Sequence, residues 1–433
     1  MYFSKSQILA ILAFTSAVAA TPLAAPRVSH KGTRVLRLDV RSEEDVALVE
    51  GLVKRLQLDT WTHGFVANSH VDVAVPASVQ PEFNRVLKNA RLVTRVMHED
   101  LEASIEAESQ PSTLMKRTSP GCPVKSAVDP SWFTAYHAYD NHLKFLQALV
   151  AAYPGNAEIV TAGKSTEGRD LTGIHIWGTT KGRPAVVLHA NVHAREWITS
   201  KVVEYFANEL LKSTTSSSSA TVNAYDYFIF PVVNPDGFVY SQTSDRMWRK
   251  NRLRPSGSSS CYGTDINRNW DFNWNLSGGA STNQCAQDFK GVSPGNTAEY
   301  KGLSAFIVNL KKTVDVKLFI DYHSYSQLIL SPWGYTCKEP APDEKEHLRV
   351  MKIWEAAMSK SYGTRFQTGP SCTTIYPTTG DSTDWTYGAV NITHSYSVEL
   401  RDTGRNGFVL PPAQIIPSGK EAWEGFQALI EAI

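Results

Sequence analysis

The chain has 433 residues, of which 42% are hydrophobic and 20% charged, a composition that is ordinary for a globular protein and argues against wholesale disorder, collagen-like repeats or a coiled coil. Its 43 basic and 42 acidic residues leave a net charge of +1, and nothing in that balance suggests a nucleic-acid binder. A chain of this length is typically divided into about two to three domains.

Residues 1–20 have the pattern of a secretory signal peptide. Lys5 supplies a basic start, residues 8–14 form a short apolar stretch, and Ala-Val-Ala at 17–19 is a small-residue cleavage pattern. The apolar stretch is too short to span a bilayer, and no later stretch has the about 18 consecutive apolar residues that a spanning helix needs. We therefore expect a soluble, secreted protein without a membrane partner, with the vacuole as an alternative destination.

Residues 21–117 alternate between strand-like and helix-like patterns. The expected elements, in chain order, are strand 34–40, helix 43–56, strand about 61–66, strand 70–75, helix 78–88 and strand 91–98. This βαββαβ order is the split βαβ arrangement of a small ferredoxin-like α+β domain. A charged helix is expected at 99–108, and the polar segment after it contains Lys116-Arg117, which we interpret as a proteolytic processing site.

Residues 118–433 read as one large α/β region. Strand-like runs at 185–188, 227–233, 316–321 and 394–400 are accompanied by helical patterns at 197–211, 298–311, 347–362 and 421–432. This alternation predicts a mixed, mainly parallel twisted sheet with helices on both faces.

The first chemical signal is His193 with Glu196, which follow an apolar strand. A histidine and a carboxylate three residues apart can bind one metal, and two nitrogens with one carboxylate leave zinc an open position for water. Ligands bind at the carboxyl ends of strands in open α/β sheets. His323, after the apolar run 317–321, is the candidate third ligand. Taken singly, each of these is a weak signal, because such residues are usually structural.

Hydrolysis also needs a base, and Glu399 lies at the end of the expected strand 394–400. A glutamate facing zinc can deprotonate a water molecule whose pKa the metal has lowered to about 7. Taken singly, a glutamate this close to Arg401 is more often part of a surface ion pair.

Four segments together make the pattern specific. They are His-Ala-Arg-Glu-Trp at 193–197, Asn-Arg-Asn-Trp at 267–270, His-Ser-Tyr-Ser-Gln-Leu at 323–328 and Glu-Leu-Arg-Asp-Thr-Gly at 399–404. In this order they resemble the pancreatic-type zinc carboxypeptidases of the carboxypeptidase A/B family, and carboxypeptidase A is a known example of a His₂Glu zinc site. The resemblance covers about 129–433, and the preceding region resembles the family's propeptide in size and element order. It implies a signal peptide at 1–20, an activation propeptide at 21–117 and a catalytic domain at 118–433.

The resemblance also implies roles for individual residues. One Zn²⁺ per chain would be held by His193, Glu196 and His323, with Glu399 as general base and Arg249 polarising the scissile carbonyl. The other matching residues hold the substrate's terminal carboxylate (Asn267, Arg268, Tyr376), line neighbouring subsites (Arg195, Tyr325, Phe408) or orient the first zinc histidine (Asp265). An arginine can grip a planar carboxylate bidentately, which restricts cleavage to the last peptide bond. Read alone, Arg249 is a surface cation of the basic run 246–254, as we expect Lys250 to be.

The five cysteines suit an oxidising compartment, but their spacing does not give their pairing. The resemblance implies the disulfides Cys261–Cys285 and Cys337–Cys372, which leaves Cys122 over. The sequons at Asn275 and Asn391 are candidate glycosylation sites.

The resemblance also implies a pocket for the substrate's C-terminal side chain, with Thr383 at the position of its floor. This residue is uncharged, as are the other matching lining positions, which are Gly334, Ser371, Thr378 and Ser397. Burying an unpaired lysine there would be costly, so an apolar or aromatic preference is expected, broadened by the polarity of Thr383. If Asp381 points inward, basic residues would also be accepted.

We expect a secreted zymogen of a zinc exopeptidase that acts on peptides and proteins as a monomer. Its own propeptide would be its inhibitor, and a separate protease would activate it. A catalytically dead peptide-binding homologue is a different reading, against which the intact Glu399, Arg249 and ligand positions argue. A zinc amidohydrolase for small acylated amino acids is another, against which the carboxylate clamp and the propeptide argue.

Overall fold

The computed structural model describes residues 27–62, 64–90, 92–110, 129–214, 220–257 and 260–433. The expected signal peptide, the processing site at Lys116-Arg117 and Cys122 lie outside these ranges. Within them, no helix is both long and apolar enough to cross a membrane.

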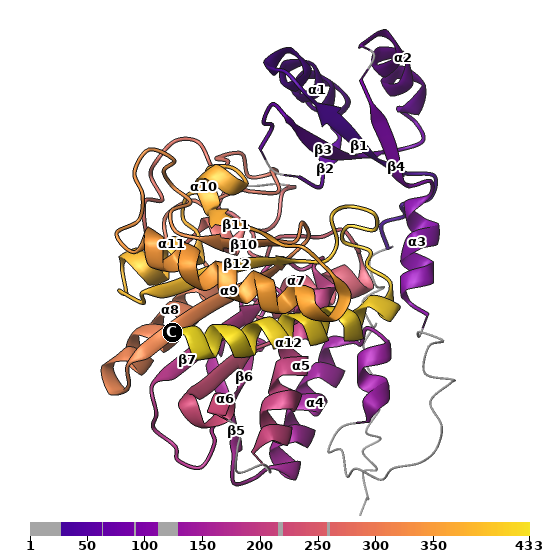
Figure 1. Ribbon diagram of the computed structural model, residues 1–433. Helices are drawn as coiled ribbons and strands as arrows, with labels where there is room; N and C mark the ends of the chain where they lie inside the picture. Colours follow the sequence, from indigo (N-terminus) through magenta and orange to yellow (C-terminus); the bar gives the residue numbers. More distant parts are fainter. Residues whose placement is uncertain (1–26, 63, 91, 111–128, 215–219, 258–259) are drawn as a thin grey trace, which may run out of the picture.

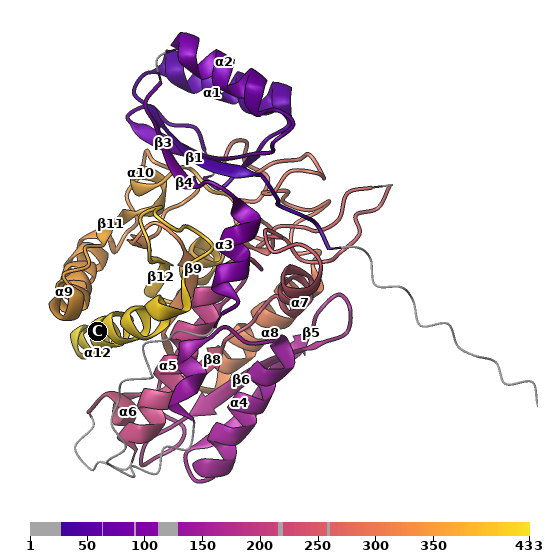
Figure 2. The ribbon, with the colours of Figure 1, turned by 90° about the vertical axis from the view of Figure 1, so that its right-hand side faces the viewer.

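The N-terminal domain has the expected βαββαβ order. Its elements are β1 (Arg34–Val40), α1 (Glu43–Leu56), β2 (Asp59–Thr60), β3 (Ser69–Val75), α2 (Gln80–Ala90) and β4 (Thr94–His98). The strands form an antiparallel sheet in the order β2-β3-β1-β4. Both helices cover the outer face of this sheet, and its other face is turned toward the larger domain (Figure 2). Helix α3 (Leu101–Glu108) then runs down the side of the larger domain (Figure 1).

The strand expected at about 61–66 is wrong. Strand β2 ends at Thr60, and Trp61 makes one further backbone hydrogen bond, to the Asp72 carbonyl of β3. Trp61 is only 3% exposed because it packs on Phe408 of the larger domain, with ring centroids 5.2 Å apart. Gly64 has φ +78°, a left-handed conformation that ends regular strand geometry. Trp61, the first residue of the expected strand, therefore makes an interdomain contact.

The larger domain is built on an eight-stranded sheet. Its strands are β5 (Ala157–Lys164), β6 (Asp170–Ile176), β7 (Ala185–Ala190), β8 (Asp226–Phe230), β9 (Val316–Ser324), β10 (Leu328–Ser331), β11 (Gln367–Pro370) and β12 (His394–Leu400). They lie in the order β11-β10-β12-β9-β7-β8-β6-β5. The central strands β12, β9, β7 and β8 are mutually parallel. The pairs β5–β6, β6–β8 and β10–β12 are antiparallel, and β11 is parallel to β10.

Helices cover both faces of this sheet, as expected. They are α4 (Tyr139–Ala152), α5 (Trp197–Ser213), α6 (Ala220–Ala224), α7 (Pro235–Thr243), α8 (Ala298–Thr313), α9 (Glu344–Tyr362), α10 (Ser371–Thr374), α11 (Ser382–Gly388) and α12 (Ile415–Ala432). Side chains of β7 alternate between two cores. Val186 and Leu188 pack with α4, α5, α9 and α12, whereas Ala185 and Val187 pack with α8 and α11. A strand buried on both faces needs apolar residues in both directions, which explains its continuous apolar sequence.

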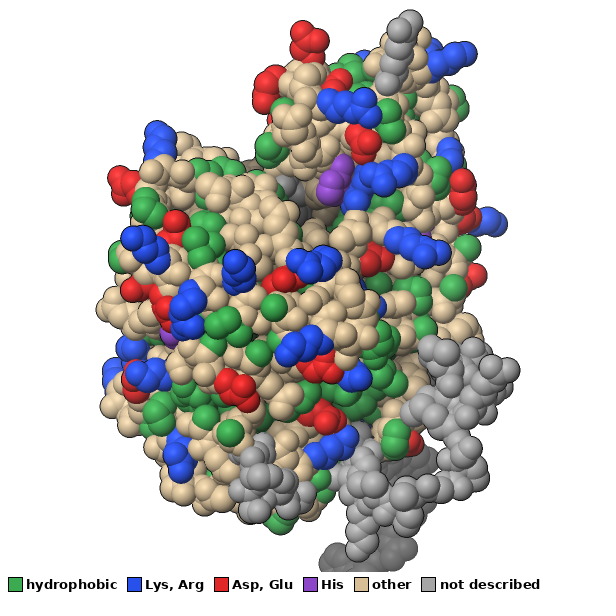
Figure 3. Space-filling view, viewed as in Figure 1, with side chains coloured by type: hydrophobic (Ala, Val, Ile, Leu, Met, Phe, Trp, Pro, Cys, Tyr) green, Lys and Arg blue, Asp and Glu red, His purple; other side chains and the backbone are tan. Residues whose placement is uncertain are grey.

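The sheet brings distant residues to one edge. His193 and Glu196 lie in the connection from β7 to α5, His323 lies near the carboxyl end of β9, and Glu399 pairs with His323 in the parallel β12–β9 register. A hollow lies over this edge, between the N-terminal domain and the larger domain (Figure 3).

Candidate active site

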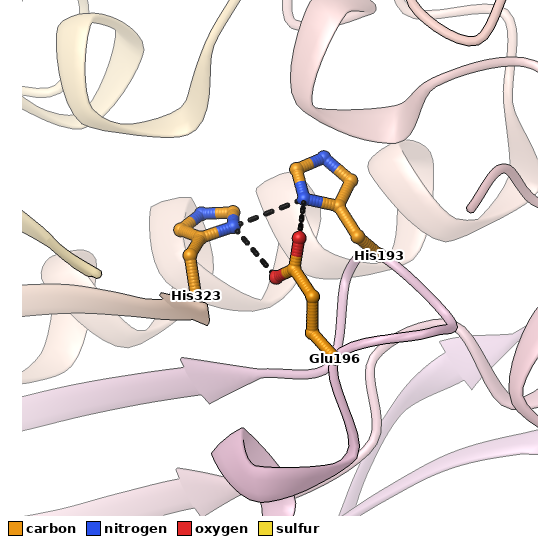
Figure 4. Close-up of side chains that lie close together, drawn as sticks. All are labelled: His193, Glu196 and His323. Atoms are coloured by element: carbon orange, nitrogen blue, oxygen red, sulfur yellow. Dashed lines mark hydrogen bonds and ion pairs between the residues drawn. The ribbon is translucent and has the colours of Figure 1, made fainter. Parts of the chain in front are cut away.

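Three buried side chains converge at the carboxyl ends of β7 and β9 (Figure 4). The His193 Nδ1 atom is 2.9 Å from Glu196 Oε1, the His323 Nδ1 atom is 3.3 Å from Glu196 Oε2, and the two Nδ1 atoms are 3.1 Å apart. Donor atoms arranged tetrahedrally around zinc at about 2.0–2.1 Å are about 3.3 Å from one another. The three residues therefore have both the chemistry and the spacing of a site for one zinc ion.

Asp265 links this cluster to Arg249. Its Oδ1 atom is 3.2 Å from His193 Nε2, and its Oδ2 atom accepts hydrogen bonds of 3.1 and 2.8 Å from Arg249 Nε and Nη2. The Ala194 N–H donates to the Arg249 carbonyl, which fixes the arginine beside the ligand loop. Both side chains are buried, so Arg249 is no surface cation. Neither is Lys250, which is 4% exposed and donates to the Gln284 carbonyl.

Glu399 faces the same cavity from β12. Its side chain is partly exposed to the cavity, yet the surrounding protein desolvates the carboxylate and raises the pKa of Glu399 to about 8. The carboxylate of Glu196 also raises this pKa, whereas His323 and Arg249 lower it. A carboxylate that binds protons this readily suits a group that accepts a proton and returns it.

Asn267, Arg268 and Tyr376 form one side of the cavity, which has a volume of about 430 Å³. Arg268 donates to the Asn267 carbonyl at 2.8 Å and approaches the Tyr376 hydroxyl at 3.5 Å. Its Nε atom is buried and has no protein partner. A fixed guanidinium that lines a polar cavity is suited to bind an anionic group.

The expected subsite residues contact the N-terminal domain. The Tyr325 hydroxyl donates to Asp72 at 2.5 Å, and Arg37 binds both oxygens of Asp72 at 2.7 and 2.6 Å. Arg195 lies 4.0 Å above the Phe408 ring, on which Trp61 also packs. The N-terminal domain therefore covers the cavity at Tyr325 and Phe408.

Sequence reasoning missed the pair Arg37 and Asp72. They are direct partners in the β1–β3 register, and Arg37 also donates to the Thr403 carbonyl of the larger domain. The available signal was a charged residue flanked by apolar residues in each strand, Arg37 in β1 and Asp72 in β3, because a charge that becomes buried needs a partner.

The side-chain pocket departs from expectation at its floor. Thr383 is 2% exposed, and its hydroxyl is bonded to that of Ser397 at 2.5 Å. The cavity wall includes Ser371, Thr378, Ser397 and Asp381, but Thr383 and Gly334 do not reach it. Asp381 therefore lies at the cavity, where its carboxylate accepts a hydrogen bond of 2.7 Å from the Thr378 hydroxyl. Burial raises the pKa of Asp381.

The structure also shows the expected disulfides and the exposure of the two sequons. The structure contains the disulfides Cys261–Cys285 and Cys337–Cys372. The sequon residues Asn275 and Asn391 are exposed, so both side chains are accessible to a glycosyltransferase.

A two-histidine, one-glutamate cluster above parallel strands, with a carboxylate and two arginines facing one cavity, defines a zinc hydrolase. The family model for zinc carboxypeptidases matches residues 142–425, and the model for the carboxypeptidase activation peptide matches residues 36–108. The chain belongs to the zinc carboxypeptidase family. It is a metallocarboxypeptidase, a hydrolase of C-terminal peptide bonds, preceded by an activation peptide that acts as its inhibitor.

Individual relatives agree with this assignment. A metallocarboxypeptidase A-like protein of Trichophyton verrucosum is 42% identical over 409 residues, which cover 94% of each chain. Mouse carboxypeptidase A2 is 35% identical over 406 residues, covering 93% of this chain and 94% of the mouse protein. The crystal structure of thrombin activatable fibrinolysis inhibitor has a TM-score of 0.82 at 27% identity, covering 93% of this chain and 98% of that chain.

Proposed function

We propose that the chain is a secreted, monomeric zymogen, with a signal peptide at 1–20, a propeptide at 21–117 and a catalytic domain at 118–433. Activation by a separate protease would occur near Arg117, beyond the end of α3. The observation that carries this proposal is the cover over the catalytic cavity, where Asp72 binds Tyr325 and Trp61 packs on Phe408. Removal of the N-terminal domain opens that cavity to a peptide.

In the opened site, Arg268, Asn267 and Tyr376 bind the terminal carboxylate of the substrate. This contact sets the last peptide bond beside His193, Glu196 and His323. These three residues would hold a zinc ion, which would supply Lewis-acid chemistry at a water molecule and at the scissile carbonyl.

Two further side chains carry out the proton and charge steps. Glu399 takes the proton from the attacking water and delivers it to the nitrogen of the departing residue, so that the bond breaks without forming an amide anion. Arg249, held by Asp265, stabilises the negative charge that develops on the carbonyl oxygen.

We propose a preference for apolar and aromatic C-terminal residues, because the serine and threonine side chains of the wall offer no charge. A second specificity is favoured by one observation: Asp381 is among the residues that line the cavity, with its carboxylate oxygens accepting hydrogen bonds from the Thr378 hydroxyl and the Asp384 N–H. A lysine or arginine reaching it would gain a charged partner, so basic C-terminal residues are also accepted, at a lower rate.

The test uses processed enzyme and N-terminally blocked dipeptides that end in Phe, Leu, Lys or Arg. We expect turnover of the Phe and Leu substrates, with loss on chelation and recovery on adding zinc. Faster turnover of the Lys or Arg substrates would overturn the proposed preference. If zinc-loaded enzyme without its propeptide hydrolyses none of them, the chain is a peptide-binding homologue. Hydrolysis of acylated single amino acids in preference to all four would favour the amidohydrolase.

A further inference from the structure

A second buried carboxylate lies behind the zinc cluster. Asp321 precedes His323 by two positions in β9, so both side chains point to the same face of the sheet. Asp321 is 1% exposed. Its Oδ2 atom is 3.3 Å from His323 Nε2 and accepts a hydrogen bond of 2.6 Å from the Ser382 hydroxyl at the start of α11.

The rest of the site determines which nitrogen of His323 carries the proton, and therefore which group donates in the contact with Asp321. His323 Nδ1 faces His193 and Glu196, so its lone pair is the one directed at the metal position. In a neutral imidazole, the proton is then on Nε2. The other group near Nε2 is the Asn267 amide nitrogen at 3.3 Å, whose orientation is set because Asn267 Oδ1 accepts from the Ser382 N–H at 2.8 Å. An amide nitrogen donates only, so Asn267 cannot accept the proton that Nε2 carries when Nδ1 binds the metal. The Asp321 carboxylate, 3.3 Å from Nε2, is the acceptor available to that proton.

We propose that Asp321 is a positioning residue for zinc. It fixes the tautomer and ring orientation of His323 and raises the basicity of its ligand nitrogen, as a carboxylate behind a metal-bound histidine generally does. Asp265 occupies the corresponding position behind His193. Both zinc histidines therefore have a carboxylate partner, on separate elements.

Ser382 connects this arrangement to substrate binding. Its hydroxyl holds Asp321, while its N–H holds Asn267, which we place in the site for the terminal carboxylate. The first residue of α11 therefore positions both the partner of a zinc ligand and a residue that binds substrate.

A second histidine near Asp321, His189, does not form an ion pair with its carboxylate. His189 on β7 is the partner of Asp321 in the β7–β9 register. Burial lowers the pKa of His189 to about 4, so the imidazole is neutral at ordinary pH. The His189 Nε2 and Asp321 Oδ1 atoms are buried without a protein partner, so the described contacts of this carboxylate are those to His323 and Ser382.

The inference rests on the proposed role of His323, and its test therefore measures zinc binding separately from turnover. In processed enzyme, the zinc dissociation constant is measured by competition with a chelator of known affinity, for wild type, Asp321→Asn and Asp321→Ala. Because an amide oxygen still accepts a hydrogen bond, we expect a graded loss, smaller for Asn than for Ala. The Ala variant should bind zinc about 10- to 100-fold more weakly. The absorption spectrum of cobalt-substituted enzyme should also change, because it reports the ligand geometry.

The matched control is Asp226→Asn. Asp226 is also a buried carboxylate bonded to a histidine, at 3.0 Å from His175 Nε2, but it is not among the residues of the zinc cluster or the cavity. We expect it to keep the wild-type zinc affinity. If folded Asp321→Ala also keeps that affinity and the cobalt spectrum, Asp321 is only structural and the proposal is wrong.

If the Asp321 variants do not fold, the zinc affinity of Ser382→Ala tests the proposal instead. This variant keeps the carboxylate and removes its anchor, so a few-fold weaker zinc binding supports the proposal and an unchanged affinity overturns it. Wild-type enzyme that binds no zinc would instead contradict the proposed function itself.

Discussion

The carboxylate of Glu108 at the end of α3 is bound by the guanidinium of Arg246 through two hydrogen bonds of 2.7 and 2.8 Å. Both side chains are buried, and Arg246 also donates to the carbonyls of Arg195 and Phe408, which belong to the expected subsites. The last helix of the N-terminal domain is therefore fastened directly to the backbone of the cleft.

Replacing Glu108 by alanine should weaken binding of the cleaved propeptide to the enzyme. A buried ion pair that loses one partner leaves an uncompensated charge, at a cost of about 3–5 kcal/mol, which is about 100-fold or more in the dissociation constant. The measurement is recovery of activity when cleaved zymogen is diluted. Glu82→Ala is the control, since the exposed pair Glu82–Arg55 contributes about 0–1 kcal/mol. Equal dissociation constants for the two variants would refute the role of Glu108.

Propeptide binding should weaken at acidic pH through His98. This residue bonds to the Asn406 carbonyl at 2.9 Å and to the Ser104 hydroxyl at 2.8 Å. Burial lowers the pKa of His98 in the docked state, against opposing effects of the Asn406 carbonyl and Asp402. Because the released propeptide binds the proton more tightly, docking is strongest above about pH 6.5 and weakens as the pH falls below it. Dissociation measured across that range should lose part of its pH dependence in His98→Gln, and an unchanged profile would argue against this residue.

Asp381→Asn should change substrate preference. Loss of a carboxylate that pairs with a substrate cation costs about 1.5–3 kcal/mol, so the ratio of kcat/KM for Lys-ended over Leu-ended substrates should fall about tenfold or more. Turnover of the Leu-ended substrate serves as the internal control for folding. A ratio equal to that of wild type would show that Asp381 does not contact the bound side chain.

Glu399→Gln should retain zinc and lose catalysis. A positioned base contributes about 10²- to 10⁴-fold to the rate, so kcat should fall by that factor. Zinc content and the affinity for a non-hydrolysed substrate analogue should stay near wild type. A variant that still hydrolyses peptides at the wild-type rate would assign the base to another residue.

Much of the site could be predicted because its residues occur in short, ordered motifs. His193 and Glu196 are three residues apart, so a single turn brings them together. His323 and Glu399 each lie at the end of an apolar strand that the sequence pattern predicts. The short distance between His323 and Glu399 depends on the register of β12 and β9. No local sequence pattern predicts that register.

Other features depend on packing that the sequence does not express locally. Strand β11 has four residues and includes Gly369 and Pro370, whereas β5 is an edge strand interrupted by Gly163, so neither carries a strong strand pattern. Trp61 was placed in a strand, although its ring packs on Tyr325 and Phe408 of the larger domain as well as on His98 of its own domain. The position of Asp381 at the cavity wall depends on how α11 begins, which pattern alone does not reveal.

The pairing of Glu399 with His323 across β12 and β9 ties catalysis to the most protected part of the molecule. Backbone amides in central strands exchange with solvent only through large-scale opening, whereas surface loops open at small free-energy cost. The spacing between the base and the metal cluster is thus set by ladder hydrogen bonds between buried strands. Heating should therefore abolish turnover together with the cooperative melting of the sheet, and loosening of peripheral loops at lower temperature should leave this spacing intact.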